Sequence, residues 1–345
     1  MIREIYYALH CILKIGGQAF FKLEERYQTA EQIYASFDRP SGELQEIKRK
    51  LEQYEKQKIH FVGYGETKYP FLLKQIASPP LGLFYKGKLP EENVPAVAMI
   101  GARDYTMYGR EMAKSFAKRL SADGVQIISG MALGIDGFSH EGAFAGGTST
   151  FAVLGTGVDI CYPKRNQWIY EKLEKEGGII SEFEPGTVAR PENFPIRNRL
   201  ISGLSQGVFV IEARKKSGSL ITAGFALEQN RDVYVLPGRV GDRQSEGCNE
   251  LIQQGARLVM SPSDILENLY VREQGNNKKV KKTKIVLETT EKMVYAKLRC
   301  EPKHIDVIAK EAGISRTEAI RTLISLEHKE FSIQIIPNYY IRNLN

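Results

Sequence analysis

Between Val97 and Gly255 the sequence repeats one kind of unit five times: a short β-rich run, a glycine-bearing loop, and the start of a helical pattern. Such alternation predicts an α/β fold, with a parallel sheet covered by helices on both faces. We expect strands near residues 95–100, 125–129, 149–154, 178–183, 207–212, 233–236 and 257–260. Helices are expected near 107–122, 136–145, 166–176, 197–204, 219–230, 248–254 and 262–269.

Each loop of these units carries a cation or a hydroxyl group. Loops that follow parallel strands leave their carboxyl ends and meet at one edge of the sheet. The sequence therefore predicts a rim of phosphate donors, which would include Arg103, Ser129, Lys164, Arg197, Arg199, Lys215 and Ser217.

Gly101 and Arg103 end the first strand, where a glycine lets the backbone approach a ligand and an arginine can grip a phosphate with two N–H groups. The helix that follows adds free N–H groups and a positive dipole end. An alternative is that Arg103 pairs with a local carboxylate, Asp104 or Asp136; the phosphate role is favoured. Asp136 itself is expected to have a structural role, as a helix cap.

Other loops offer similar groups. Arg197 and Arg199 lie two residues apart on a helix and point to different faces, so we expect one at the rim and the other bound to a carboxylate, with the choice open. Trp168 could stack on a base, although a lone aromatic on a helix is more often core. The candidate phosphate-binding residues are Gly101, Arg103, Ser129, Gly130, Lys164, Arg197, Arg199, Ser217, Gly218 and Ser219.

The remaining chain divides into four parts. Residues 1–58 are predicted to form an N-terminal helical module, either helix-hairpin-helix (SAM-like) or a small bundle that packs on its neighbour, which is favoured. Residues 59–270 are predicted to form the Rossmann-like core, whose first strands extend the main sheet. Residues 271–284 are predicted to form a basic linker. Residues 285–345 predict a C-terminal winged helix of three helices and a hairpin. Its recognition position, 315–327, mixes arginine with glutamate, which favours protein contact or weak DNA binding.

Composition excludes several classes of protein. The 345 residues carry a net charge of +7, which fits a polyanion partner without requiring one. The four cysteines form no CxxC pair, so neither a metal site nor a disulfide framework is predicted, and a reducing cytosol is expected. No cofactor is predicted either. The apolar run at the N-terminus is too short and interrupted to span a bilayer, so we expect no membrane anchor.

Several segments together resemble the DNA-processing protein A family, also called Smf, of bacterial natural transformation. They run in order across the core: IGARDYTMYG, ISGMALGIDGFSHEGA, LGTGVDICYPKRN, GIISEFEPGT, FPIRNRLISGLS, SGSLITAGFALEQNRDVYVLPG and GCNELIQQGA. The resemblance implies a Rossmann-like core that binds single-stranded DNA. It also implies a homodimer, and a mediator that loads the recombinase RecA onto incoming strands rather than an enzyme.

Two alternatives remain. The core also resembles phosphoribohydrolases of the lysine-decarboxylase-like type, but KKSGSLITA lacks the glutamate of their motif. A glycosidase needs a placed carboxylate, for which Glu182, Glu184 and Glu212 are the nearby candidates. A nucleophile elbow, HExxH, Walker A and the G-x-G-x-x-G spacing are absent from the sequence. The second alternative, a regulator acting through the winged helix, leaves the basic rim without a role.

The last elements of the core hold more apolar residues than one helix face needs. An apolar sheet edge marks a partner surface or an aggregation hazard, and a twofold contact would cover it. Coverage within one chain is nearly as plausible. The predicted dimer surface comprises Leu251, Ile252, Leu258, Ile265 and Leu269.

Overall fold

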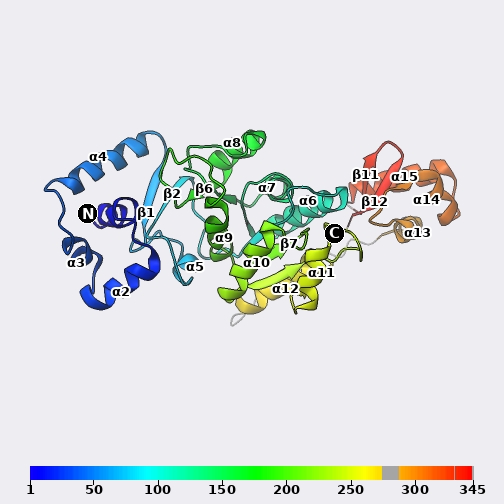
Figure 1. Ribbon diagram of the computed structural model, residues 1–345. Helices are drawn as coiled ribbons and strands as arrows, with labels where there is room; N and C mark the ends of the chain where they lie inside the picture. The colour runs from blue at the N-terminus through cyan, green and yellow to red at the C-terminus, as the bar shows by residue number, and fades with distance from the viewer. Residues whose placement is uncertain (274–286, 330, 344–345) are drawn as a thin grey trace. The chain divides into compact units, whose positions relative to one another are not determined.

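The computed structural model describes residues 1–273, 287–329 and 331–343, and it divides the chain into two compact units, Met1–Met260 and Ser261–Asn345. Figure 1 shows the elements of both. The predicted basic linker at 271–284 lies mostly outside the described residues, since only 271–273 are described, at the end of a helix.

The first unit is built on a nine-stranded sheet, in the order β1-β2-β6-β5-β4-β3-β7-β8-β9 among the described residues. Strands β3 to β9 pair in parallel where they are neighbours, whereas β2 pairs antiparallel with both β1 and β6. The predicted parallel sheet, and its extension by the segment before it, are confirmed. The strands are β1 (His60–Gly63), β2 (Gly82–Gly87), β3 (Ala96–Ile100), β4 (Gln126–Ser129), β5 (Thr150–Val153), β6 (Gly178–Ser181), β7 (Gly207–Val210), β8 (Asp232–Val235) and β9 (Arg257–Leu258).

Helices cover both faces of this sheet because its strands alternate their buried side chains between the two. On one face, Leu200 of α9 and Ala223 of α10 share a core with Ala98 and Val208 of the central strands. The helices between the strands are α5 (Phe71–Lys74), α6 (Met107–Ala122), α7 (Ile135–Gly146), η2 (Lys164–Asn166), α8 (Gln167–Glu176), α9 (Asn193–Gly203), α10 (Gly218–Glu228) and α11 (Glu246–Gln253).

Helices α6 and α7 approach each other closely through glycine. A Cβ atom on Gly142 would lie 2.4 Å from the carbonyl oxygen of Lys114, and one on Gly146 would lie 2.4 Å from that of Lys118. Only a residue without a side chain fits at these positions. Gly142 and Gly146 of the DGFSHEGAFAGG stretch thus serve helix packing.

The N-terminal helices pack against the β1–β2 end of the sheet (Figure 1). The ring of Tyr7 lies 5.4 Å from Phe61 of β1 and 6.1 Å from Phe84 of β2, centroid to centroid. The predicted packing of this module on its neighbour is confirmed. Thr29 caps α3, and its hydroxyl accepts the Gln32 N–H at 3.2 Å. The helices are α1 (Ile2–Tyr7), η1 (Ala8–Ile12), α2 (Gly17–Tyr27), α3 (Ala30–Ala35) and α4 (Glu43–Lys56).

Where the structure describes it, the second unit contains helix α12 (Pro262–Glu273), three further helices and a small sheet, in the order β10-β12-β11. The Ser315 hydroxyl caps α15 by accepting the Glu318 N–H, and Ile320 and Ile324 are exposed on that helix. The winged-helix assignment stays a prediction. The elements are α13 (Thr289–Lys297), β10 (Lys303–His304), α14 (Ile305–Ala312), α15 (Arg316–His328), β11 (Ser332–Ile336) and β12 (Tyr339–Arg342).

Among the described helices, none has both the length and the apolar composition that crossing a bilayer requires.

Candidate nucleic-acid interface

The strand order reverses at β3. After β3 the chain adds β4, β5 and β6 on one side, and it then returns to add β7, β8 and β9 on the other. In such sheets ligands bind outside the carboxyl ends of the strands where the order reverses. A cleft of about 570 Å³ lies at this point, lined by the loops after β3 and β7 and by one side of α9. It brings together six of the predicted residues, Gly101, Arg103, Arg197, Ser217, Gly218 and Ser219.

Arg103 is exposed at the cleft, with its guanidinium 5.7 Å from the centre of the Phe194 ring. Arg103 makes no hydrogen bond or close ion pair with Asp104 or Asp136, although the attraction of its charge opposes the burial that raises the pKa of Asp136. Asp104 pairs instead with Arg214. A guanidinium that lies over an aromatic ring and forms no close ion pair can bind an anion.

Arg197 is buried, with 4% of its surface exposed, although it lines the cleft. Its Nη1 donates to the carbonyl of Gly130 at 2.9 Å and to that of Val153. Burial lowers the pKa of Arg197 to about 10, which the nearby Asp136 opposes, so the guanidinium stays charged at neutral pH. Arg197 thus supplies a fixed positive charge at the floor of the cleft.

Asp136 holds the loop after β4. Its Oδ2 accepts the N–H groups of Gly130 at 3.1 Å and Ala132 at 3.4 Å, and so it has the expected structural role, but through this loop rather than as the cap of α7. Burial raises its pKa, against the attraction of Arg197. A Cβ atom on Gly130 would lie 2.7 Å from Asp136 Oδ2, so the packing here requires glycine.

Two other predicted groups do not line the cleft. Ser129 is fully buried and donates its hydroxyl to the carbonyl of Met99 at 2.6 Å. Lys164 is exposed at the start of η2, two residues after Tyr162, which does line the cleft. Asn166, which precedes α8, donates its side-chain amide to the carbonyls of Met131 and Ala132 at 2.9 and 3.0 Å and makes no side-chain cap to the helix.

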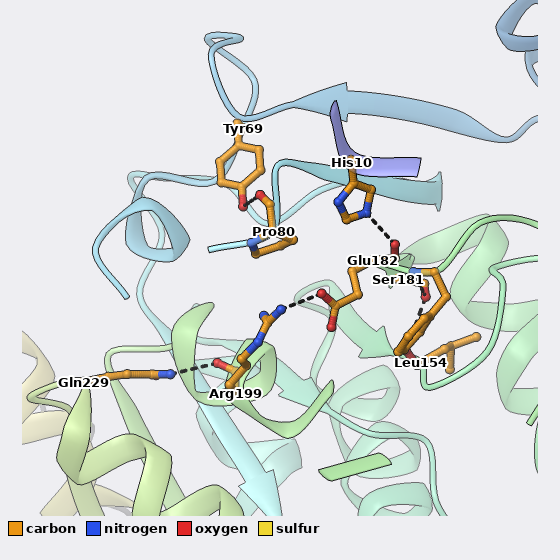
Figure 2. A network of polar contacts seen from close by, with 9 residues as sticks. His10, Tyr69, Pro80, Leu154, Ser181, Glu182, Arg199 and Gln229 are labelled. Atoms are coloured by element: carbon orange, nitrogen blue, oxygen red, sulfur yellow. Dashed lines mark hydrogen bonds and ion pairs between the residues drawn. The ribbon is translucent and has the colours of Figure 1, made fainter. Parts of the chain in front are cut away.

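Arg199 belongs to a separate polar network, shown in Figure 2. Its Nη2 lies 2.5 Å from Oε2 of Glu182, and its carbonyl accepts the Gln229 amide at 3.0 Å. The carbonyl of Glu182 accepts from Nε2 of His10, in the N-terminal module, at 2.7 Å. Of the two arginines on α9, Arg199 therefore binds the carboxylate and Arg197 faces the cleft.

The three carboxylates considered for hydrolysis are all engaged away from the cleft. Besides Glu182, Glu184 binds Lys50 at 2.6 Å and Tyr7, and Glu212 accepts the backbone N–H of Thr106 at 3.0 Å. Burial raises the pKa of Glu212. None of the three lines the cleft. The described residues also hold no cluster of three or more His, Cys, Asp or Glu that could bind a metal.

The N-terminus of α10 opens into the cleft. Ser217 caps it, with its hydroxyl accepting the Ser219 N–H at 3.4 Å and lying 2.7 Å from the Ser219 hydroxyl. The side-chain amide of Asn198 donates to the Gly218 carbonyl at 3.4 Å and so links α9 to this turn. Free N–H groups at the positive end of an 11-residue helix favour a bound anion.

Phe194 and Tyr162 line the cleft and were missed by sequence reasoning. Their ring centres are 5.5 Å apart, and both Arg103 and Arg197 lie within 6 Å of the Phe194 ring. The predicted start of α9 at residue 197 was wrong, because the helix begins at Asn193 and includes Phe194 and Pro195. Proline fits there because the first turn of a helix leaves its N–H groups unpaired. The spacing of Phe194, Arg197 and Ile201 could have shown their common face.

The predicted dimer residues are unequally accessible. Leu251 and Ile252 are partly buried, Leu258 is 42% exposed, and Ile265 and Leu269 are buried. Of the five, Leu258 alone is a large exposed hydrophobic residue, which narrows the surface available to a second copy. The dimer itself stays a prediction.

Comparison with known proteins gives a consistent set of relatives. The family model described as DNA recombination-mediator protein A matches residues 60–270. Protein Smf of Escherichia coli is 36% identical over 317 residues, covering 90% of this chain and 83% of that protein. Protein Smf of Synechocystis is 38% identical over 237 residues, 67% of this chain, and the chain spans only 60% of that relative's length.

Two solved structures are also similar. DNA processing protein A from Streptococcus pneumoniae matches with a TM-score of 0.65 and 34% identity, over 77% of this chain and 96% of that one. The protein of the same name from Helicobacter pylori, whose structure was reported for its single-stranded DNA binding mode, matches with a TM-score of 0.56 and 29% identity. This match covers 61% of the present chain and 96% of the Helicobacter pylori chain.

Proposed function

This chain belongs to the DNA recombination-mediator protein A family, and we propose that it binds single-stranded DNA in the cleft at the carboxyl ends of β3 and β7. The observation that carries the proposal is Arg103, which lies exposed over Phe194 and forms no close ion pair with a carboxylate of the described residues. Beside it are the buried charge of Arg197 and the N-terminus of α10. Phosphate oxygens are the ligands that all three features favour.

The aromatic rings at the cleft favour a single strand over a duplex. Phe194 and Tyr162 accompany the cations, and Tyr162 is 44% exposed. Proteins that bind single strands without sequence preference combine a positive groove with rings on which unpaired bases stack. The single-stranded DNA binding reported for the Helicobacter pylori relative supports the same choice.

We extend the proposal to a homodimer that protects incoming DNA and loads RecA onto it during transformation, in the cytoplasm. Its support is the family's description as a recombination mediator and the relatives named DNA processing protein. Capture of RecA by the full chain tests the loading role. Light scattering tests the assembly, and a monomer at high concentration would reject the dimer.

The test of DNA binding is a titration of labelled oligonucleotides at several salt concentrations. For single strands, log K falls against log salt with a slope of about −0.7 per neutralised phosphate. We expect Arg103→Ala to weaken binding of every sequence similarly and to reduce the slope by about 0.7.

The matched control is Arg119→Ala. Arg119 is also an exposed arginine, paired with Asp123 at the other end of α6 from the cleft. This variant should bind like the wild type. Equal affinities for the Arg103→Ala variant and the wild type at low and high salt would reject the cleft as the binding site.

A further inference from the structure

We infer that Trp168 is a second, base-stacking contact for the DNA strand, outside the cleft and one helical turn beyond Lys164. The inference rests on the proposed function. Trp168 is the only tryptophan of the chain, and it lies on α8 with 49% of its surface exposed. The expectation that it is a core residue is therefore wrong.

The Trp168 ring is held by a neighbouring helix. Phe144 of α7 lies 6.5 Å away, centroid to centroid, with the ring planes inclined by 54°. Lys172, one turn further along α8, places its Nζ 4.7 Å from the centre of the same Phe144 ring. An indole that is half exposed yet braced against a second ring offers a firm surface on which a base can stack.

A lysine lies on either side of Trp168 in the sequence. Lys172, four residues after Trp168, shares a face of α8 with it, and Lys164 begins η2, the turn that leads directly into α8. We call these three residues the stripe. The ammonium group of Lys164 has no hydrogen-bond or ion-pair partner among the described residues. Lys172 forms an ion pair with Glu176, with 3.6 Å between Nζ and Oε2. Phosphates on either side of a stacked base would meet these two amines.

The stripe continues from the cleft. Tyr162 lines the cleft and lies 5.5 Å from Phe194, and the turn between Tyr162 and Trp168 is fixed by the two hydrogen bonds that Asn166 donates to carbonyls of the β4–α7 loop. A strand that leaves the cleft past Tyr162 therefore meets Lys164 and then Trp168. This alternation of rings and cations fits a nucleic acid better than the apolar surface of a protein partner.

The single tryptophan makes the test direct, because all tryptophan fluorescence of the full chain comes from Trp168. Thymidine oligomers from about 4 to about 16 nucleotides span the usual range of single-strand sites. We expect short oligomers to bind without changing the emission, and longer ones to quench it. An abasic oligomer of the longest length keeps the phosphates but should not quench.

Affinity supplies the second readout. The Trp168→Ala substitution should lower the affinity for the longest oligomer about 5-fold or more, because stacking on a ring is lost. The affinity for the shortest oligomer should not change. Trp168→Phe keeps a ring and should recover most of the loss. The matched control is Phe71→Ala, which removes a ring of similar exposure (52%) that does not line the cleft. This substitution should change the affinity for neither oligomer.

Three results would overturn the inference: equal emission with intact and abasic oligomers, wild-type affinity of the Trp168→Ala variant for the longest oligomer, or an emission change caused by protein concentration alone. The last would mark a contact between copies of the chain. If the shortest oligomer still binds in an Arg103-dependent way, the proposed function stands without this contact. If no oligomer binds, the proposed function itself fails.

Discussion

At the scale of single residues, Arg103 and Arg197 carry the same group but have different tasks. Arg103 is exposed over Phe194 and can move to meet a phosphate, whereas Arg197 is fixed by the carbonyls of Gly130 and Val153. These partners lie 67 and 44 residues away in the sequence. The sequence could predict that an arginine at position 197 is a candidate for phosphate binding. It could not predict that Arg197 is buried, because its partners are backbone carbonyls from distant parts of the chain.

His140 on α7 is a buried residue whose titration should be visible. Its Nδ1 lies 2.8 Å from the Thr150 hydroxyl, and burial lowers its pKa from 6.5 to about 3. The unfolded state therefore binds a proton that the folded state does not, and stability is lost as the pH falls below 6.5. We expect about 3 kcal/mol of this loss between pH 7 and pH 4.

Urea unfolding as a function of pH checks this expectation. The His140→Asn variant should lose much less stability on acidification than the wild type, while His60→Asn, at a half-buried site on β1, serves as the control. Parallel curves for the wild type and the His140→Asn variant would contradict the expectation.

At the scale of elements, α9 is the helix on which the site depends. One side presents Phe194 and Arg197 to the cleft, and Arg199 ties another side to Glu182 and, through it, to His10 of the N-terminal module (Figure 2). Strand and helix periodicity predicted α6 to the residue, but it placed the start of α9 four residues late. Local sequence patterns therefore predict where most elements lie, but the proline in the first turn of α9 obscured where this helix begins.

The pair of Glu182 and Arg199 should stabilise α9 without touching DNA. Arg199→Ala leaves the largely buried Glu182 carboxylate without its partner, which should lower the free energy of unfolding by about 3–5 kcal/mol. Replacing both, as Glu182→Leu with Arg199→Met, removes both charges and should recover most of the loss. Thermal unfolding and DNA titration of both variants check this.

The double variant also decides whether Arg199, one of the candidate phosphate-binding residues, contacts DNA. Since Arg199 does not line the cleft, we expect the stable double variant to bind single-stranded DNA as tightly as the wild type. A weaker affinity at wild-type stability would make Arg199 a DNA ligand.

At the scale of the whole molecule, the N-terminal helices and the sheet form one compact unit, and the last 85 residues form another. The sequence predicted the α/β class and the rim of loops, because both follow from the order of strands and helices. It could not predict which loops would form the cleft, since that depends on the reversal of strand order at β3.

Photo-cross-linking of single-stranded DNA to the full chain, followed by peptide mapping, tests the central claim most directly. The cleft at the carboxyl ends of β3 and β7 predicts adducts in peptides that contain Arg103, Tyr162, Phe194 and Ser217. These adducts should disappear as salt rises, since phosphate contacts release counterions. Adducts confined to residues 287–343 would contradict the claim and would move DNA binding to the second unit.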